Sequence, residues 1–426
     1  MNSNKNIVVY GSGFAALLIS CNLVDKGHTV SLISPKKSIG GILNPLTIFE
    51  DQIDIGPQFM ENLNFDEKNL LERYIDKDQY SDIGISYGSF YNGKYSSDFG
   101  IPDLSALSEA KKKDLLDANI NFLKIDSADL TLKELLSLKY GSLSNDFIKL
   151  SEKFLVNDAN NLASSNYNYL EFGGRIRIYN DEISNKLKKD PIKDKIIAAS
   201  RKVISDNSFS LYPKKGPLGK LVESMLSYLI KNNAEIIKDN FLINTKDSCI
   251  SLGNKKSRYD LLFIASDHLS FMEDREIYSL DRPCLFHYLK LDSKPKISHY
   301  YYMNYDLDMI HTRATNYFNY HNSPSDNKFI CIEQPVRKIE IDKNITEAFQ
   351  KKAISEYEDI FEQKLFIIDT KSVFTPKTFP LWKPNAINKI TENLQKIISN
   401  NANIISLPIQ ASQRSDAIRF ALDLDI

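Results

Sequence analysis

The first forty residues constrain the fold more than any other part of the chain. The apolar run Ile7–Tyr10 is typical of a buried strand, and Thr29–Ile33 is rich in β-branched residues and predicts a second strand. Between them, Ala15–Lys26 has apolar residues at helical spacing, and Gly27 is expected to end this helix. The turn before the helix reads Gly11-Ser12-Gly13-Phe14-Ala15-Ala16. A strand, glycine turn, helix and strand in this order predict the opening of an α/β dinucleotide-binding fold.

Each small residue of this turn has a physical role in such a fold. Gly11 allows the tight bend, Gly13 lets the backbone approach a pyrophosphate, and Ala16 lets the helix pack closely on the strand. The phosphates would lie at the helix N-terminus, near Gly13, Phe14 and Ala15. The free N–H groups and the helix dipole favour negative charge there without a basic side chain.

The end of the second strand departs from the usual pattern. A carboxylate about 20 residues after the glycine turn commonly holds the adenosine ribose, but Ser34 stands at this position. Serine can still make one hydrogen bond, without the extra strength of a charge-assisted one. Lys36 and Lys37 follow, and two interpretations stay open for them: contact with a 2′-phosphate, or ordinary solvated lysines.

Three spaced motifs in the first sixty residues resemble one family. They are Gly11-Ser12-Gly13, Lys37-Ser38-Ile39-Gly40-Gly41 and Asp54-Ile55-Gly56-Pro57. Together they resemble the opening of the flavin amine oxidase superfamily, which includes protoporphyrinogen oxidase, phytoene desaturase and UDP-galactopyranose mutase. The resemblance implies that FAD is the cofactor, that Gly40 and Gly41 lie against it, and that Gly56, Pro57 and Gln58 come close to the flavin.

Further matches extend the resemblance over most of the chain. Tyr212–Leu218 is similar to the Y-P-x-G-G segment of the family, and Tyr259–Ser266 resembles its strand that ends in small residues. Ser89–Tyr95 resembles a hairpin of the family's substrate domain, and His311–Tyr317 resembles a T-R-I stretch of the mutases. The last match implies that Arg313 and Tyr317 bind substrate.

Two departures concern groups that hold the flavin. Ile42-Leu43-Asn44 stand where an arginine often follows the glycine pair, and Ile405–Gln410 lacks the acid that usually ends the last strand. The next segment, with Ser415, Asp416 and Ala417, resembles the start of the helix whose N-terminus faces the flavin ring. Counting Ser34, two carboxylates that hold the cofactor are absent. A hydrogen bond to a charged group contributes about 1.5–3 kcal/mol, so reduced or lost flavin affinity stays an open alternative.

The pattern along the chain predicts an α/β protein with a discontinuous Rossmann-like FAD-binding domain and an inserted α+β substrate domain. We expect helical segments that include Leu104–Phe122 and Leu132–Phe154, then aromatic strands between Pro283 and Pro335. The FAD-binding domain is expected to comprise residues 1–64, 208–275 and 372–426. The substrate domain is expected to comprise 65–207 and 276–371.

Candidate substrate-binding residues fall in this inserted part. Arg175 and Arg177 alternate in Gly173–Arg177, so they could form an anion clamp because guanidinium groups match carboxylate or phosphate; a solvated edge is the alternative interpretation. Many of the 22 tyrosines also lie here, and they suit either a flavin or sugar pocket or ordinary sheet packing. The clearest examples are Tyr87, Tyr91, Tyr95, Tyr300, Tyr301 and Tyr302.

Composition excludes several other classes of protein. The net charge of −1 gives no reason to expect nucleic acid as a partner. Four cysteines without CxxC spacing, and six histidines without HxH or HExxH spacing, argue against a metal site. Neither a signal peptide nor an apolar run of about 18 residues is present. We therefore expect a cytoplasmic protein with a small-molecule substrate, no membrane span and an undetermined oligomeric state.

The resemblance implies an FAD-dependent oxidoreductase that acts on a small organic substrate. No catalytic side chain can be named, because the flavin carries the hydride chemistry in such enzymes. One alternative is a mutase-like flavoenzyme for a nucleotide sugar, in which Arg175, Arg177 and Arg313 would grip the diphosphate. The other is a non-catalytic or flavin-deficient protein that keeps the fold to bind a ligand or partner.

Overall fold

The computed structural model forms two compact units, each described separately below. One comprises residues 1–84, 206–275 and 387–426, and the other comprises 85–205 and 276–386. The residues that the structure describes are 4–36, 38–84, 86–97, 99–200, 209–238, 242–244, 248–252, 255–265, 268, 275–320, 328–337, 342–399, 401, 403–408 and 414–424.

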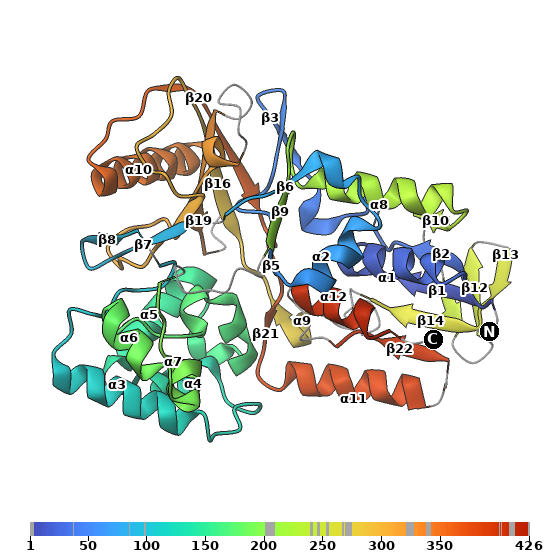
Figure 1. Ribbon diagram of the computed structural model, residues 1–426, viewed down its shortest axis with the longest axis horizontal. Helices are drawn as coiled ribbons and strands as arrows, with labels where there is room; N and C mark the ends of the chain where they lie inside the picture. Colours follow the sequence, from blue (N-terminus) through green and yellow to red (C-terminus); the bar gives the residue numbers. More distant parts are fainter. Residues whose placement is uncertain are drawn as a thin grey trace. The chain divides into compact units, whose positions relative to one another are not determined.

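The first unit is built on a five-stranded parallel sheet with the order β10-β2-β1-β14-β22 (Figure 1). In chain order this is 3-2-1-4-5, the order of a Rossmann-type sheet, in which a ligand binds beyond the carboxyl ends of the central strands. The strands are β1 (Asn6–Tyr10), β2 (Thr29–Ile33), β10 (Glu235–Ile237), β14 (Leu261–Ile264) and β22 (Ile404–Ser406). The predicted α/β class and the opening strand-helix-strand unit are confirmed.

Helices α8 and α12 of this unit both pack against α1. Helix α1 is buried along most of its length, and Leu17, Ile19 and Leu23 are among its buried side chains. Its end follows the prediction, since Gly27 takes a positive φ of 86° that other residues rarely adopt. The helices are α1 (Phe14–Asp25), α2 (Phe65–Glu72), α8 (Gly219–Lys231), α11 (Ala386–Ser399) and α12 (Arg414–Leu422).

Three small antiparallel sheets complete the first unit. Because β6 pairs with β9, and α2 packs against α12, the unit extends beyond the expected boundary at residue 64 to Gly84. The small sheets contain β3 (Leu46–Ile48) with β4 (Asp51–Ile53), β5 (Met60–Leu63) and β6 (Tyr80–Asp82) with β9 (Phe209–Pro213), and β11 (Leu242–Asn244), β12 (Cys249–Leu252) and β13 (Lys255–Arg258).

The second unit contains a seven-stranded sheet with the order β20-β16-β19-β18-β17-β7-β8. Only the β17–β7 pair is parallel among its described pairings. Because β20 pairs with β16, this unit keeps the residues after 371 that were assigned by sequence to the cofactor domain. The strands are β7 (Tyr87–Tyr91), β8 (Lys94–Ser96), β16 (Cys284–Leu291), β17 (Tyr301–Asn304), β18 (Arg313–Asn316), β19 (Phe329–Pro335) and β20 (Ile367–Thr375).

Helix α10 (Lys343–Phe361) covers one face of this sheet. Ala353 and Tyr357 of the helix belong to one apolar cluster with Tyr302, Ala314 and Ile332 of the strands. Successive strand residues point to opposite faces, so Tyr301, Arg313 and Glu333 lie on the face that α10 does not cover. Arg313, one of the predicted substrate-binding residues, therefore lies on this second face.

The remaining part of the second unit is mainly helical. The expected segment Leu132–Phe154 is split into α4 and α5, because Gly141 takes a positive φ of 49° and ends the first of them. Tyr140 and Phe147, one from each helix, stack with ring centroids 3.7 Å apart. The remaining elements are α3 (Glu109–Phe122), α4 (Leu132–Tyr140), α5 (Ser144–Leu155), α6 (Asp181–Leu187), α7 (Pro191–Ile196), α9 (Arg275–Tyr278), β15 (Ser279–Leu280) and β21 (Leu381–Trp382).

Within the described residues, no helix combines the length and the apolar character that a membrane crossing requires.

Candidate cofactor and substrate sites

The glycine turn between β1 and α1 leaves open space in front of the helix. Gly11 has a φ of 150° and donates its N–H to the Ile33 carbonyl at 2.9 Å, which fixes the bend. Gly13 precedes α1 in an extended conformation, and no side chain caps the helix. A Cβ atom added to Gly13 would meet nothing within 4 Å. The N-terminus at Phe14 and Ala15 is thus a cradle that fits a pyrophosphate group.

The predicted glycine pair lies beside this cradle. Gly40 donates its N–H to the Ser12 carbonyl at 2.7 Å. A Cβ on Gly41 would lie 3.6 Å from the Cα of Gly13, an ordinary contact distance, so the two glycines lie side by side. Both have positive φ, 117° for Gly40 and 59° for Gly41. The structure therefore brings two of the three motifs together.

Ser34 follows β2 at the predicted position, but its hydroxyl is engaged locally. It donates to the Lys36 carbonyl at 2.7 Å and accepts from the Lys36 N–H at 3.2 Å. The Ser34 N–H is also paired, with the Ile237 carbonyl at 2.9 Å. These bonds fix the turn after β2, and contact of Ser34 or Lys36 with an adenosine stays a prediction. Lys37 lies outside the described residues.

Asp54, the acid of the third motif, is a buried carboxylate. It accepts hydrogen bonds from the Tyr212 hydroxyl at 2.6 Å and from the Leu218 N–H at 3.0 Å. Burial raises the pKa of Asp54 to about 6, although both hydrogen bonds and the charge of Arg414 oppose the rise. Asp54 therefore links the third motif to the segment before α8, which the sequence resemblance had matched separately.

The raised pKa of Asp54 gives a testable dependence of stability on pH. A raised folded-state pKa stabilises the protein below the ordinary value near 3.8, and this contribution is lost as pH rises through about 6. As the pH rises from 4 to 7, the free energy of unfolding of wild type should therefore fall by on the order of 2 kcal/mol relative to that of Asp54→Asn. Urea unfolding at several pH values measures the difference. The exposed control Asp117→Asn should show no such trend, and a constant difference for Asp54→Asn would contradict the prediction.

Arg414 is a candidate cofactor residue that the sequence did not reveal. It lies at the start of α12 and donates to the Phe59 carbonyl at 2.7 Å and to the side-chain oxygen of Gln58. Gln58 is buried and itself donates to the Ile55 carbonyl at 2.8 Å. Burial lowers the pKa of the Arg414 guanidinium, while the nearby Glu61 and Asp54 oppose this. No local signal marks Arg414, because its partners lie more than 350 positions earlier.

The turn before Gln58 contains Gly56 and Pro57. Gly56 has a φ of 64°, so this position favours a glycine. The structure thus brings this turn, predicted to approach the flavin, next to the first residue of α12.

The start of α12 also places the predicted Ser415, Asp416 and Ala417. Ala417 is buried, and Asp416 lies 3.8 Å from Arg419 one turn later. Arg419 is further paired at 3.0 Å with Glu67, which caps α2 and so ties the two helices together. The expected lack of an acid after β22 concerns Ile409 and Gln410, which lie outside the described residues.

On the substrate side, Arg175 and Arg177 are each paired with a carboxylate. Arg175 donates to the Asp194 carbonyl at 2.8 Å and lies 3.7 Å from its carboxylate. Arg177 is 2.7 Å from Asp181, and its guanidinium stacks 4.0 Å from the centre of the Phe99 ring. The two preceding glycines contribute carbonyls that hold the buried Lys139, each at 2.9 Å. These contacts support structural roles for both arginines.

Arg313 belongs to a network of alternating charges on the sheet face opposite α10. It makes a two-pronged pair with Glu333, at 2.7 and 2.8 Å. Burial alone would lower the pKa of Arg313, but Glu333 more than offsets it and the pKa is raised. Arg282, which donates to the Phe154 carbonyl at 2.7 Å, interacts electrostatically with both groups. Desolvation by the surrounding protein raises the pKa of the Glu171 carboxyl, and the charge of Arg313 opposes the rise.

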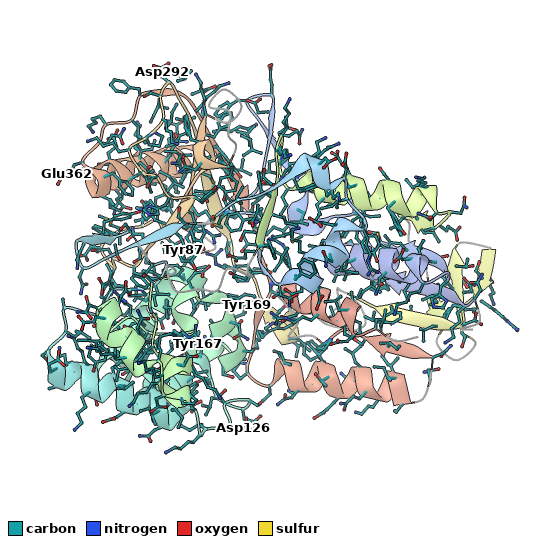
Figure 2. All side chains as sticks on the ribbon, viewed as in Figure 1. Tyr87, Asp126, Tyr167, Tyr169, Asp292 and Glu362 are labelled. Carbon is teal, nitrogen blue, oxygen red and sulfur yellow. The ribbon has the colours of Figure 1, made fainter. Side chains whose placement is uncertain are left out.

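The tyrosines divide between the two faces of this sheet. Tyr95 and Tyr302 lie among the rings that pack under α10 and are explained by packing. Tyr87, labelled in Figure 2, lies on the other face with its ring 5.4 Å from that of Tyr301. Tyr317, predicted to bind substrate, is 1% exposed. Tyr301 and Tyr305 both interact electrostatically with Arg313, so they lie beside the charged network, and Tyr87 lies next to Tyr301.

Among the described residues, no three His, Cys, Asp or Glu side chains are grouped as metal ligands would be. The four cysteines are all buried and unpaired.

Comparison with known proteins gives matches by structure alone. No family model matches the chain. No curated protein matches it in sequence either.

Solved structures match the chain over almost its whole length. A reduced UDP-galactopyranose mutase is similar with a TM-score of 0.69 and 12% identity, over 99% of this chain and 93% of that one. A protein from Exiguobacterium sp. 255-15, described as a protoporphyrinogen oxidase, gives 0.64 and 13%, over 99% and 98%. A putrescine oxidase variant gives 0.60 and 10%, over 98% and 97%. The chain therefore has the fold that these three solved structures share.

Proposed function

We propose that the first unit binds FAD and that the protein is an FAD-dependent oxidoreductase for a small organic substrate. The observation that carries the proposal is the open cradle at Gly13, because a helix N-terminus without a cap, faced by a glycine pair, suits a pyrophosphate. The shared fold supports the same conclusion.

In this proposal, different groups of residues contact different parts of the cofactor. Gly11, Gly13, Phe14 and Ala15 would hold the pyrophosphate, and Gly40 and Gly41 would lie against it. The turn Gly56–Gln58 and the N-terminal residues Arg414–Ala417 of α12 would hold the flavin end, where Arg414 supplies a positive charge. When bound, FAD supplies the hydride chemistry, and the protein orients the substrate and excludes water.

The charge of the candidate substrate face favours a substrate without a diphosphate. Arg282 and Arg313 are balanced by Glu333 and Glu171, so this group carries no net charge. Two prongs of Arg313 are already occupied by Glu333. A diphosphate would have to displace this carboxylate, and breaking a buried pair is costly. Tyr87, which is partly exposed beside the buried Tyr301, instead offers an aromatic ring to a small organic molecule.

A comparison of FAD with FMN tests the cofactor assignment. FMN has the same ring system but only one phosphate and no adenosine, so it cannot use the whole glycine cradle. We expect calorimetry on apoprotein to give FAD at least ten-fold tighter binding than FMN. Equal affinities, or no binding of either, would contradict the proposal.

The second candidate function is that of a mutase for nucleotide sugars, which the similarity to UDP-galactopyranose mutase favours. Binding of nucleotide diphosphates distinguishes this candidate from an oxidoreductase. Because Arg175, Arg177 and Arg313 are all paired with carboxylates, we expect no binding of UDP, CDP or GDP at millimolar concentration. Calorimetry on the FAD-loaded protein is the measurement. Binding of UDP that charge reversal of Arg313 weakens, with FAD binding unchanged, would favour the mutase instead.

A further inference from the structure

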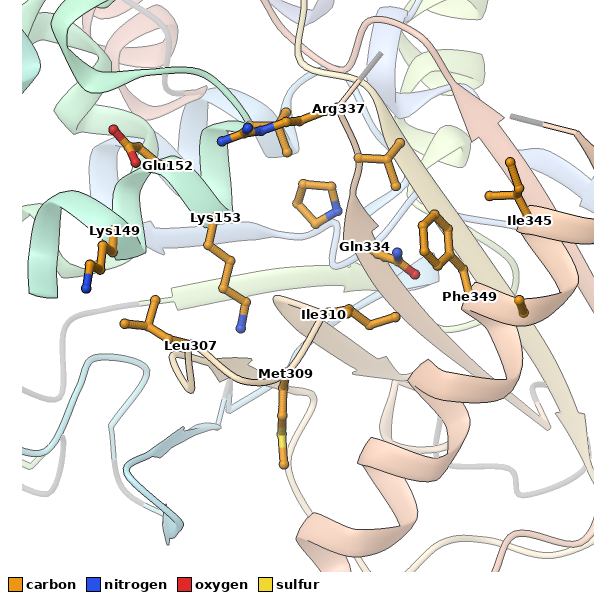
Figure 3. A pocket seen from close by; sticks show the side chains of 14 residues that line it. Lys149, Glu152, Lys153, Leu307, Met309, Ile310, Gln334, Arg337, Ile345 and Phe349 are labelled. Carbon is orange, nitrogen blue, oxygen red and sulfur yellow. The ribbon is translucent and has the colours of Figure 1, made fainter. Parts of the chain in front are cut away.

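The second unit contains a cavity that none of the predicted cofactor or substrate residues lines. Its volume is about 740 Å³, within the range of pockets that hold organic ligands (Figure 3). It is partly open to solvent and is lined by α5, the segment after β17, the end of β19 and the first turns of α10. The cavity therefore belongs to a single unit and is built from its secondary structure.

Most of the cavity wall is apolar. Leu307 is 43% exposed, so part of this apolar surface is open to solvent. Covering such a surface with the apolar part of a ligand is favourable, because it removes apolar area from water. The apolar lining residues are Val156, Leu307, Met309, Ile310, Pro335, Val336, Ile345, Ala348 and Phe349.

One amine, that of Lys153, lies among these apolar side chains (Figure 3). Its Nζ donates to the Asn304 carbonyl at 3.1 Å and to the Asp306 carbonyl at 2.6 Å. A lysine ammonium has three N–H donors, so one remains without a protein acceptor among the described residues. Burial lowers the pKa of Lys153 to about 7, although the charges of Glu356 and Asp306 oppose this. An anionic acceptor from a ligand would satisfy the third donor and offset the lost hydration.

The rim of the cavity is also predominantly basic. Lys149 and Arg337 line it and are exposed, and Glu152 is the single acidic residue of the lining. The Glu152 carboxylate accepts from the Ala159 N–H at 3.3 Å. Hydrogen bonds from Asn160 lower the pKa of Asp158, and the charge of Arg337 adds to this. With Lys153, the lining contains three basic side chains and one carboxylate.

We propose that this cavity binds an amphipathic monocarboxylate, with its carboxylate on Lys153 Nζ and its apolar chain or ring against the wall of α10. A single remaining donor matches one carboxylate oxygen, whereas a phosphate needs several donors. The proposal does not depend on FAD, because no residue of the first unit takes part.

Calorimetry with decanoate and 1-decanol tests the proposal, since the two probes share a chain and differ in the headgroup. We expect one decanoate per chain, with 1-decanol at least ten-fold weaker. Lys153→Met keeps most of the side-chain length and removes the charge, so it should weaken decanoate at least ten-fold and leave 1-decanol unchanged. Lys149→Met, on the same helix but exposed, is the matched control and should change decanoate less than three-fold.

A second variant tests the proposal independently, in case Lys153→Met does not fold. Ala348 is exposed on α10 and lines the cavity, so Ala348→Trp should fill the space and abolish binding of both probes without disturbing the core. FAD binding should be unchanged in every variant. Absence of decanoate binding, equal affinity for 1-decanol, or binding that Ala348→Trp leaves intact would overturn the proposal. The last result would place decanoate at another site, such as the substrate face, without affecting the flavin assignment.

Discussion

Replacing Gly13 with valine should abolish FAD binding while the protein stays folded. A Cβ at this position meets no protein atom within 4 Å, so the folded chain tolerates the side chain. The same space is where the pyrophosphate would lie, and a branched side chain fills it. We expect FAD affinity to fall by more than about 100-fold, or ~3 kcal/mol. Calorimetry measures the affinity, and circular dichroism checks the fold.

Gly84→Val is the matched control for this variant. Gly84 belongs to the same unit, and its Cβ would also meet nothing within 4 Å. It lies in no part of the proposed site, so FAD should bind to Gly84→Val as it does to wild type. Undiminished FAD binding by Gly13→Val would show that the cofactor does not use this turn.

The second large effect is expected for Glu333→Gln. Glu333 is 2% exposed and accepts both prongs of Arg313, and Arg282 lies within its electrostatic range. Removing its charge leaves the buried Arg282 and the partly buried Arg313 without the carboxylate that interacts with both. Breaking a buried pair in this way typically costs about 3–5 kcal/mol, and we expect a loss of this size in the free energy of unfolding measured in urea.

An exposed ion pair provides the comparison. Glu182 and Lys186 are 2.8 Å apart, with side chains 75% and 70% exposed. Pairs of this kind contribute about 0–1 kcal/mol, so Glu182→Gln should hardly change stability. Similar losses for Glu333→Gln and Glu182→Gln would mean that the Arg313 pair contributes little, and that Arg313 remains available to an anionic substrate.

The parts of the fold that local sequence determines could be predicted. Strand β1, the glycine turn and α1 follow from apolar runs and glycines that are adjacent in sequence, and the end of α1 follows from Gly27. Likewise Asn92 and Gly93 both take positive φ in the hairpin between β7 and β8, as the resemblance implies for this segment. The break at Gly141 was missed because the pattern of apolar residues continues on both sides of it.

The parts that depend on distant contacts could not be predicted. Arg414 meets Gln58 only once α12 has folded beside β5. The pairing of Arg313 with Glu333 requires the register of β18 on β19, which no local pattern supplies. Arg313 therefore looked like a free cation in the sequence. The Lys153 cavity was missed for the same reason, because its walls come from four separate segments.

The central claim is that this chain binds FAD, and the absorbance spectrum of the protein tests it most directly. The protein should be incubated with excess FAD, separated from free cofactor by gel filtration, and measured at once. We expect about one FAD per chain, with the bands of oxidised flavin near roughly 370 and 450 nm. A colourless protein that also gives no heat on calorimetric titration with FAD up to millimolar concentration would contradict the claim and leave a fold that has lost its cofactor.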